Sequence, residues 1–316
     1  MEYADYPKLE KRLGRELLAS RLLKQAGKTA RLLHQGEGAM RIERVVPLDQ
    51  LVSIFLRFSG LAGAARRGFL NVRTVEQTWH LPRLPRAFDG FRFLQLTDLH
   101  ADLDPALTEI VVNRVAETPH DAVGITGDFR NKTSGDYSEC VAATARIAGA
   151  LAPRRWGVLG NHDFIEMVPS LEQIGLPILL NEVSVIESGR DRLWIAGIDD
   201  PHFYKTHDLN AVRAAIPRGE CAILLAHSPE VYAEAAVDSF DLQLSGHTHG
   251  GQLCLPGGRH IVIPCRLPPR FLKGRWAHGS LQGYTSPGTG SCGVAARLNC
   301  PPEITLHILR CGRPGA

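Results

Sequence analysis

Five short polar clusters lie between Asp98 and His249, and their residue types are those that hold metal ions and move protons. In chain order they are D-L-H at 98–100, G-D at 127–128, G-N-H-D at 160–163, A-H-S-P at 226–229 and G-H-T-H-G-G-Q at 246–252. Carboxylate, imidazole and amide groups dominate, and no cysteine belongs to any cluster. Such a donor set suits manganese, iron or zinc, and the clusters therefore predict a two-ion site that hydrolyses phosphate bonds.

The D-x-H spacing has a geometric reason. Asp98 and His100 flank one residue, so both side chains of an extended segment point to the same side and can chelate one ion. His247 and His249 repeat this spacing. A turn after the strand could instead direct each of these two imidazoles to a different ion, and the sequence leaves both arrangements open.

The other clusters each add one donor. Asp128 has two carboxylate oxygens and can bridge two ions, Asn161 offers a carbonyl oxygen, and His227 can complete the ligands of the second ion. A lone histidine in an apolar run is more often a hydrogen-bonded core residue, and an isolated G-D is more often a turn. The ordered set of five clusters favours the site over these separate explanations.

In order and local form, the five clusters resemble the motifs of the calcineurin-like metallophosphoesterases. The resemblance implies that a hydroxide bound between two divalent ions, with manganese first and iron or zinc as alternatives, attacks phosphorus. It implies His162 as the acid at the leaving oxygen, with Asp163 as its orienter. It implies three sets of ligands: Asp98, His100 and His249 for the first ion, Asp128 as the bridge, and Asn161, His227 and His247 for the second ion.

Residues 88–316 look like a bacterial phosphodiesterase branch of this family, through F-D-G-F-R, G-H-T-H-G-G-Q and the closing R-L-N-C-P-P-E-I-T. Some relatives in this branch, and a separate branch, hydrolyse the pyrophosphate of UDP-2,3-diacylglucosamine during lipid A synthesis. The dedicated lipid A hydrolase has arginine where this chain has His162. The tail loop G-T-G-S-C-G at 288–293 also departs from the aromatic-containing loop of relatives, which leaves its substrate contacts open.

The elements that must position these residues follow from apolar patterning. Each cluster ends a strand-like run, as in FRFLQLTDLH and DLQLSGHTHG, which is how a scaffold holds site residues on loops. Patterning predicts an α/β fold with a helical N-terminal extension, and the resemblance implies that its core is a two-sheet β-sandwich flanked by helices. We expect helices near 105–118, 138–151, 169–174 and 230–236, and strands near 72–79, 176–180, 183–187, 193–197, 222–226, 261–263, 283–285 and 304–309.

Charge separates the chain into an N-terminal extension (residues 1–68) and a catalytic domain (residues 69–316). Residues 1–90 hold 16 lysines and arginines against 9 acidic residues, whereas residues 91–316 hold 20 against 24. Leucines at helical spacing predict a basic amphipathic helix from Pro7 to Gln35, and a second helix from Leu48 to Ala65. These helices could lie on an anionic membrane, pack on the catalytic domain or pair between subunits.

Composition indicates the cellular compartment and the partners that we expect for the protein. Its seven scattered cysteines are odd in number and form no C-x-x-C pair, which suggests a reducing compartment. The sequence shows neither a signal peptide nor the roughly 20 apolar residues of a membrane span. We expect a cytoplasmic protein, soluble or peripheral on the cytoplasmic face of the membrane. Nucleic acid is an unlikely partner, because the catalytic domain is net acidic and lacks a basic aromatic strip.

Three functional hypotheses follow from the sequence. The first is a dinuclear-metal phosphodiesterase or pyrophosphatase, with UDP-2,3-diacylglucosamine as the best candidate substrate. The second is a soluble phosphodiesterase of nucleotides or cyclic nucleotides. The third is a non-catalytic adaptor that keeps the fold and uses the N-terminal extension as a binding surface.

Overall fold

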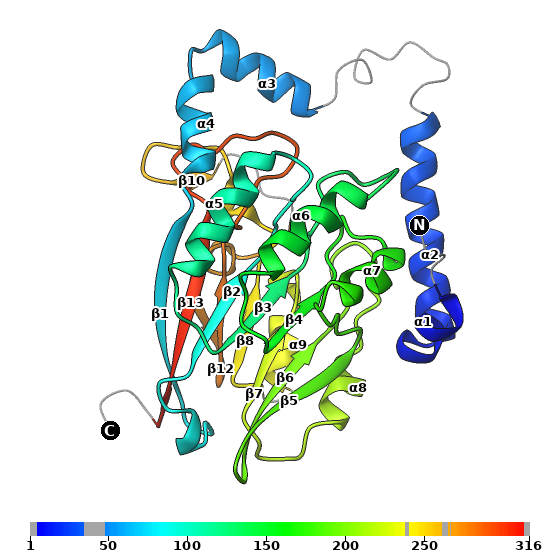
Figure 1. Cartoon of the computed structure of the whole chain (residues 1–316), viewed down its shortest axis with the longest axis vertical. Helices are drawn as coiled ribbons and strands as arrows, with labels where there is room; N and C mark the ends of the chain where they lie inside the picture. The colour runs from blue at the N-terminus through cyan, green and yellow to red at the C-terminus, as the bar shows by residue number, and fades with distance from the viewer. Residues whose placement is uncertain (1–4, 35–47, 238–239, 261–264, 266, 313–316) are drawn as a thin grey trace.

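Two mixed β-sheets lie face to face at the centre of the molecule, with helices on their outer sides (Figure 1). The computed structural model describes residues 5–34, 48–237, 240–260, 265 and 267–312. Side chains from both sheets, among them Phe93, Ile195 and Leu244, are fully buried together in the layer between them. The predicted two-sheet sandwich flanked by helices is confirmed.

The first sheet has the strand order β1-β13-β2-β3-β4. Strands β2, β3 and β4 run parallel, whereas β13 is parallel to β1 and antiparallel to β2. All five residues of β3 are buried, as expected for a parallel strand covered on both faces. The strands are β1 (Arg73–Leu81), β2 (Arg92–Leu96), β3 (Ala122–Thr126), β4 (Arg155–Val158) and β13 (Glu303–Cys311).

The second sheet has the order β11-β12-β8-β7-β6-β5, and its central strands β12, β8, β7 and β6 are parallel. A separate two-stranded ribbon pairs β9 with β10. The strands are β5 (Glu182–Ser188), β6 (Asp191–Gly197), β7 (Ala222–Leu225), β8 (Leu242–Ser245), β9 (Cys254–Leu255), β10 (Arg259–His260), β11 (Gly274–His278) and β12 (Leu281–Thr285).

Helices cover the outer face of each sheet. Apolar side chains of α5 (Pro105–Ala116), α6 (Ser138–Ala148) and α7 (Val168–Gln173) pack in one cluster with the outer face of the first sheet. Those of α8 (Leu209–Ala214) and α9 (Tyr232–Val237) pack on the second sheet. Helix α5 begins where predicted because Pro105 is its first residue and the Asp104 carboxylate caps it by accepting the Ala106 N–H.

The described part of the N-terminal extension is helical. It forms α1 (Tyr6–Leu13), α2 (Arg15–His34), α3 (Leu48–Phe58) and the beginning of α4 (Ala62–Leu70). Helices α1 and α2 stand beside α7 on the right of Figure 1, whereas α3 and α4 lie at its upper left. No helix in the described ranges is both long and apolar enough to span a membrane.

Several boundaries differ from the sequence prediction. The helix expected from Pro7 to Gln35 is interrupted at Gly14, whose φ of 86° ends α1 in a conformation that glycine adopts easily. The second helix breaks before Ala62 and continues to Leu70. The strand expected at 176–180 is reduced to a single bridge between Ile178 and Gly157. The expected strand at 261–263 lies outside the described residues.

Helices α1 and α2 are joined to the catalytic domain by buried contacts. Leu9, Leu13 and Leu18 belong to the same apolar cluster as the outer face of the first sheet. The Arg12 guanidinium contacts Glu172 and Glu182, each at 2.7 Å. Because Arg12 and the three leucines all contact the catalytic domain, the face of α1 and α2 that carries them is covered by protein.

Candidate metal centre

The predicted site residues lie at one end of the sandwich, directly after the carboxyl ends of five strands. Strand β2 leads to Asp98 and His100, β3 to Asp128, and β4 to the G-N-H-D cluster, while β7 and β8 lead to the two histidine clusters. Because β2, β3 and β4 are parallel, as are β7 and β8, their carboxyl ends meet at the same edge. All nine predicted residues therefore come together.

The backbone of this site is strained. Asp98, His100, Asp128, His247 and His249 all have φ between 42° and 71°, the left-handed region that non-glycine residues rarely adopt. Each such residue costs on the order of 1–3 kcal/mol and persists only where the surroundings impose it. This concentration of strain on the donor residues marks the site as functional.

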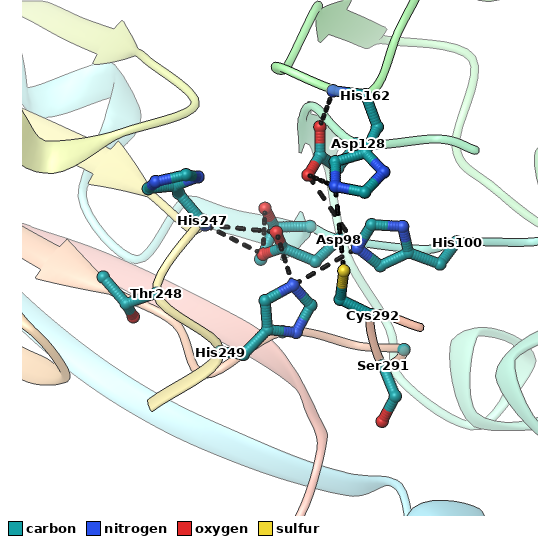
Figure 2. A network of polar contacts seen from close by, with 12 residues as sticks. Asp98, His100, Asp128, His162, His247, Thr248, His249, Ser291 and Cys292 are labelled. Carbon is teal, nitrogen blue, oxygen red and sulfur yellow. Dashed lines mark hydrogen bonds and ion pairs between the residues drawn. The ribbon is translucent and has the colours of Figure 1, made fainter. Parts of the chain in front are cut away.

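One group of donors comprises the residues predicted for the first ion (Figure 2). The Nε2 atoms of His100 and His249 lie 3.2 Å apart, and His249 Nε2 is 3.4 Å from the Asp98 carboxylate. His100 Nε2 lies 3.8 Å from Asp128 Oδ2. Asp98 is also held in place, because the His247 N–H donates to its carboxylate at 3.1 Å. These atoms converge as ligands of one cation would.

A second group shares Asp128 with the first. His227 Nε2 lies 3.4 Å from Asp128 Oδ2 and 3.0 Å from the Asn161 side-chain oxygen. It is also 3.2 Å from His247 Nδ1. Asp128 is therefore the carboxylate common to both groups, as a bridging ligand requires.

The Nδ1 contacts of two site histidines show which ring nitrogen carries a hydrogen. His100 Nδ1 and His227 Nδ1 each face a backbone carbonyl at 2.8 Å, those of Arg130 and Thr126. Carbonyls only accept, so both Nδ1 atoms carry hydrogen, and Nε2 is the nitrogen of each ring that is left to face a bound ion. Metal-binding histidines are oriented by contacts of this kind.

The donor set fits divalent ions. His247 Nε2 is buried and has no hydrogen-bond partner among the described residues. The ligand atoms of Asp128, His227 and His247 lie within 4.8 Å of one another, and those of His100, Asp128 and His162 do so as well. Two groups of nitrogen and oxygen donors that share one carboxylate match the coordination preferences of borderline divalent metals.

His162 lies at the edge of the two groups with its ring facing them. Its Nδ1 donates to the Asn131 carbonyl at 2.7 Å, and its Nε2 lies 4.0 Å from Asp128 Oδ2. Asp163 has partners other than those expected. Its carboxylate accepts the backbone N–H groups of Asp128 and Gly160 at 2.8 and 2.9 Å, so it joins two site loops, and Asn131 contacts the His162 ring in its place.

Burial and mutual interaction shift the pKa values of the site. Burial, followed by the nearby His162, lowers the pKa of His100 to about 4. Burial opposes protonation of His227, but Asp128 and other carboxylates outweigh it and raise the pKa of this histidine to about 10. Burial and the charge of Asp128 raise the pKa of Asp163 to about 6. Such strong perturbation is characteristic of functional sites.

Four residues that the sequence prediction did not assign also border the site. Cys292 lies with its sulfur 3.7 Å from His162 Nε2, and the buried Arg297 donates to the His249 carbonyl at 2.8 Å. Lys28 of α2 donates to the Asn161 carbonyl at 2.8 Å. The His202 ring packs on that of His247 with centroids 4.1 Å apart, so the loop at 199–202 lines the site.

The family model for the calcineurin-like phosphoesterase matches residues 91–251, a segment that contains every predicted site residue. The chain belongs to the calcineurin-like phosphoesterase family. This member is accordingly a metal-dependent phosphoester hydrolase. The convergence of its histidine and aspartate clusters agrees with that membership.

Relatives of this phosphoesterase are similar along most of their length. An uncharacterized metallophosphoesterase of Bacillus subtilis, YkoQ, is 29% identical over 250 residues, 75% of this chain and 89% of the relative. Phosphodiesterase YaeI of Escherichia coli is 28% identical over 270 residues, 80% of this chain and 96% of the relative. A putative 5'-nucleotidase structure from Staphylococcus aureus has a TM-score of 0.41 at 15% identity, covering 63% of this chain and 49% of that one.

Proposed function

We propose that this phosphoesterase hydrolyses a phosphodiester or pyrophosphate bond with two divalent ions. The observation that carries the proposal is the convergence of two donor groups on one shared carboxylate, Asp128. The similarity to Escherichia coli phosphodiesterase YaeI also supports a phosphodiester as the bond that is cleaved.

The site residues would have separate roles in metal binding and in proton transfer. Asp98, His100 and His249 would hold the first ion and Asn161, His227 and His247 the second, with Asp128 between them. When bound, the ions supply a nucleophilic water at neutral pH and neutralise charge on the phosphate. His162 would hold a proton at Nε2, which faces the site, and deliver it to the leaving oxygen. The Asn131 carbonyl keeps that nitrogen pointed inward.

The proposed substrate is lipid-linked, with UDP-2,3-diacylglucosamine as the most concrete candidate. Helix α3 supports this choice because its outer face is apolar. Phe55 and Phe58 are 63% and 89% exposed, and Leu51 and Ile54 are exposed beside them, while Leu56 anchors the opposite side against the domain. A contiguous exposed apolar face marks an interaction surface.

The position of α3 connects this face to the site. A Cβ placed on Gly293 would lie only 3.5 Å from Asp49 Cβ, near the beginning of α3, and Gly293 follows Cys292 at the metal centre. Arg57 and Arg67 are exposed around the same helices. We propose that α3 rests on an anionic membrane from the cytoplasmic side, so that a lipid substrate reaches the site without leaving the bilayer.

The soluble nucleotide or cyclic-nucleotide phosphodiesterase remains the second candidate, and the catalytic centre serves it equally well. A non-catalytic adaptor is the third, although the complete set of donors and His162 favours turnover. The three candidates differ in what α3 is for and in whether any phosphate bond is cleaved.

The test compares substrates rather than truncated proteins. Deleting residues 1–68 would expose Asp199, which is paired with Arg21 in the interior, so loss of activity could reflect unfolding. We would assay full-length protein reloaded with Mn²⁺ or Zn²⁺ on bis(p-nitrophenyl) phosphate and on UDP-2,3-diacylglucosamine in anionic vesicles. The variant is Phe55→Ser with Phe58→Ser, and the matched control is Val237→Ser, which alters a residue 83% exposed on α9.

The expected result is hydrolysis of both substrates, with lipid cleavage reduced at least about tenfold by the α3 variant alone and diester cleavage unchanged. Cleavage of the soluble diester alone would move the search to soluble nucleotides. No turnover of either substrate by protein with bound metal would refute the enzymatic proposal and favour the adaptor.

A further inference from the structure

The loop that connects β12 to β13 is held directly against the metal centre. The Thr289 and Gly290 N–H groups donate to the carbonyls of Thr97 and Asp98 at 2.8 and 2.9 Å. A Cβ on Gly290 would lie 2.3 Å from the Leu99 carbonyl, so only glycine permits this approach. The loop therefore has a fixed position relative to Asp98.

Within this loop, Cys292 is clamped on both sides. Its N–H donates to the Gln252 side-chain oxygen at 2.9 Å, and the Gln252 amide donates back to its carbonyl at 3.0 Å. The next residue, Gly293, donates to the Asn131 side chain at 2.8 Å, and the Asn131 carbonyl in turn accepts from His162. The backbone around the thiol is thus fixed by Gln252 of the G-H-T-H-G-G-Q motif and by Asn131, which also holds the His162 ring.

The thiol points into the site. Figure 2 shows the Cys292 sulfur among the rings of His100, His162 and His249. It lies 3.7 Å from His162 Nε2, and within 4.8 Å of a ring nitrogen from each of the other two histidines. Across the described residues, Cys292 is the one cysteine that joins such a group of metal-ligating atoms.

We propose that Cys292 supplies a sulfur ligand to the ion held by Asp98, His100 and His249. This inference rests on the metal centre of the proposed function and adds a residue that its five motifs do not contain. When the sulfur–metal bond forms, the thiol proton passes to solvent, as in other metal–thiolate sites. Sulfur is a soft donor, so the first ion is selected as zinc, iron or cobalt in preference to manganese.

The test is the spectrum of the full-length, metal-free protein titrated with Co²⁺. Wild type should develop a sulfur-to-cobalt charge-transfer band in the near ultraviolet. Cys292→Ser should lose this band while it binds as many Co²⁺ ions in equilibrium dialysis. Cys311→Ser is the matched control, because this half-buried cysteine lies at the far end of β13 and its thiol donates to the Pro85 carbonyl.

The same proteins give a second readout. The preference for Zn²⁺ over Mn²⁺ in competition should fall at least about tenfold in Cys292→Ser, since lesser changes around a metal already cost 10–100-fold in affinity. X-ray absorption of the zinc-loaded wild type should show a sulfur neighbour at about 2.3 Å. This measurement needs no variant, and it decides the question even if Cys292→Ser does not fold.

Two results would overturn the inference. One is a wild type that binds Co²⁺ or Zn²⁺ without a charge-transfer band or a sulfur neighbour. The other is a band that persists unchanged in Cys292→Ser. Two other results would refute the proposed function instead. One is a wild type that binds no divalent ion, and the other is a metal-loaded wild type that shows the sulfur signature but hydrolyses no phosphodiester.

Discussion

Arg21 of helix α2 is a buried cation whose removal should destabilise the protein strongly. Its side chain is fully buried, and its Nη1 lies 2.7 Å from the equally buried Asp199 carboxylate. Its Nη2 donates to the Asp163 carbonyl at 3.0 Å, and its guanidinium lies 3.9 Å over the Tyr204 ring. Arg21 therefore connects the N-terminal extension to the G-N-H-D loop through fully buried contacts.

Arg21→Ala should lower the free energy of unfolding by about 3–5 kcal/mol, the usual cost of leaving one partner of a buried ion pair uncompensated. Asp199 would keep its hydrogen bond from the Thr206 hydroxyl but lose its only described ion-pair partner. Domains have total stabilities of about 5–15 kcal/mol, so the loss is large enough to measure by urea unfolding. Arg57→Ala, at an exposed position of α3, should change stability by less than about 0.5 kcal/mol.

A double-mutant cycle isolates the pair. Asp199→Asn leaves Arg21 buried without its counter-charge and should also be strongly destabilising. The double variant should lose less than the sum of the two single losses, with a coupling of at least about 1 kcal/mol. A loss below about 1 kcal/mol for Arg21→Ala would match a solvent-exposed pair and refute the argument that α2 is anchored through a buried charge.

Three further predictions concern catalysis, metal binding and pH. His162→Ala should lower turnover by roughly 10²–10⁴-fold while the metal content, measured by mass spectrometry, stays at wild-type level. Asp128→Asn should lose metal occupancy in the same measurement, because both donor groups share this carboxylate. Burial lowers the pKa of His307 to about 3, while its Nδ1 accepts the Trp79 N–H at 2.9 Å. The neutral His307 ring therefore stabilises the fold above about pH 6.5, and this contribution is lost as the pH falls towards 3. When the pH is lowered from 7 to 5.5, the unfolding free energy of wild type should fall by about 1 kcal/mol more than that of His307→Gln, as measured by urea unfolding at both pH values.

That the nine predicted site residues lie close together could be expected from the sequence, because each cluster stands directly after an apolar run whose strand character is local. Parallel pairing then places the ends of these strands, and the clusters that follow them, at one edge of the sheet. Strands β2 and β3 do this for Asp98 and Asp128. The two-sheet arrangement was expected from the family resemblance and is confirmed, whereas the strand predicted at 176–180 is reduced to one bridge. Its apolar run is as strand-like as the others, but it reaches the sheet edge only at Ile178.

Residues that reach the site from outside the five motifs could not be assigned to it from the sequence. Lys28 had the pattern of any basic residue on an amphipathic helix, and only the docking of α2 places its amine on the Asn161 carbonyl. Cys292 follows a glycine-rich loop whose path depends on contacts with Gln252 and Asn131. The break at Gly14 had a visible cause, but the leucine periodicity continues through it and conceals the change of direction.

The strand order of the first sheet has a consequence for how the chain folds. Strand β13, the last in the sequence, lies between β1 and β2, and its Glu303 pairs with Arg73. Contacts between residues so distant in sequence are slow to form because a very long loop must close first. While the chain leaves the ribosome, β1 has no neighbour and one edge of β2 stays open. Until β13 emerges and pairs with both strands, these edges can pair with other chains, so the synthesis of β13 ends a period in which the nascent protein is prone to aggregate.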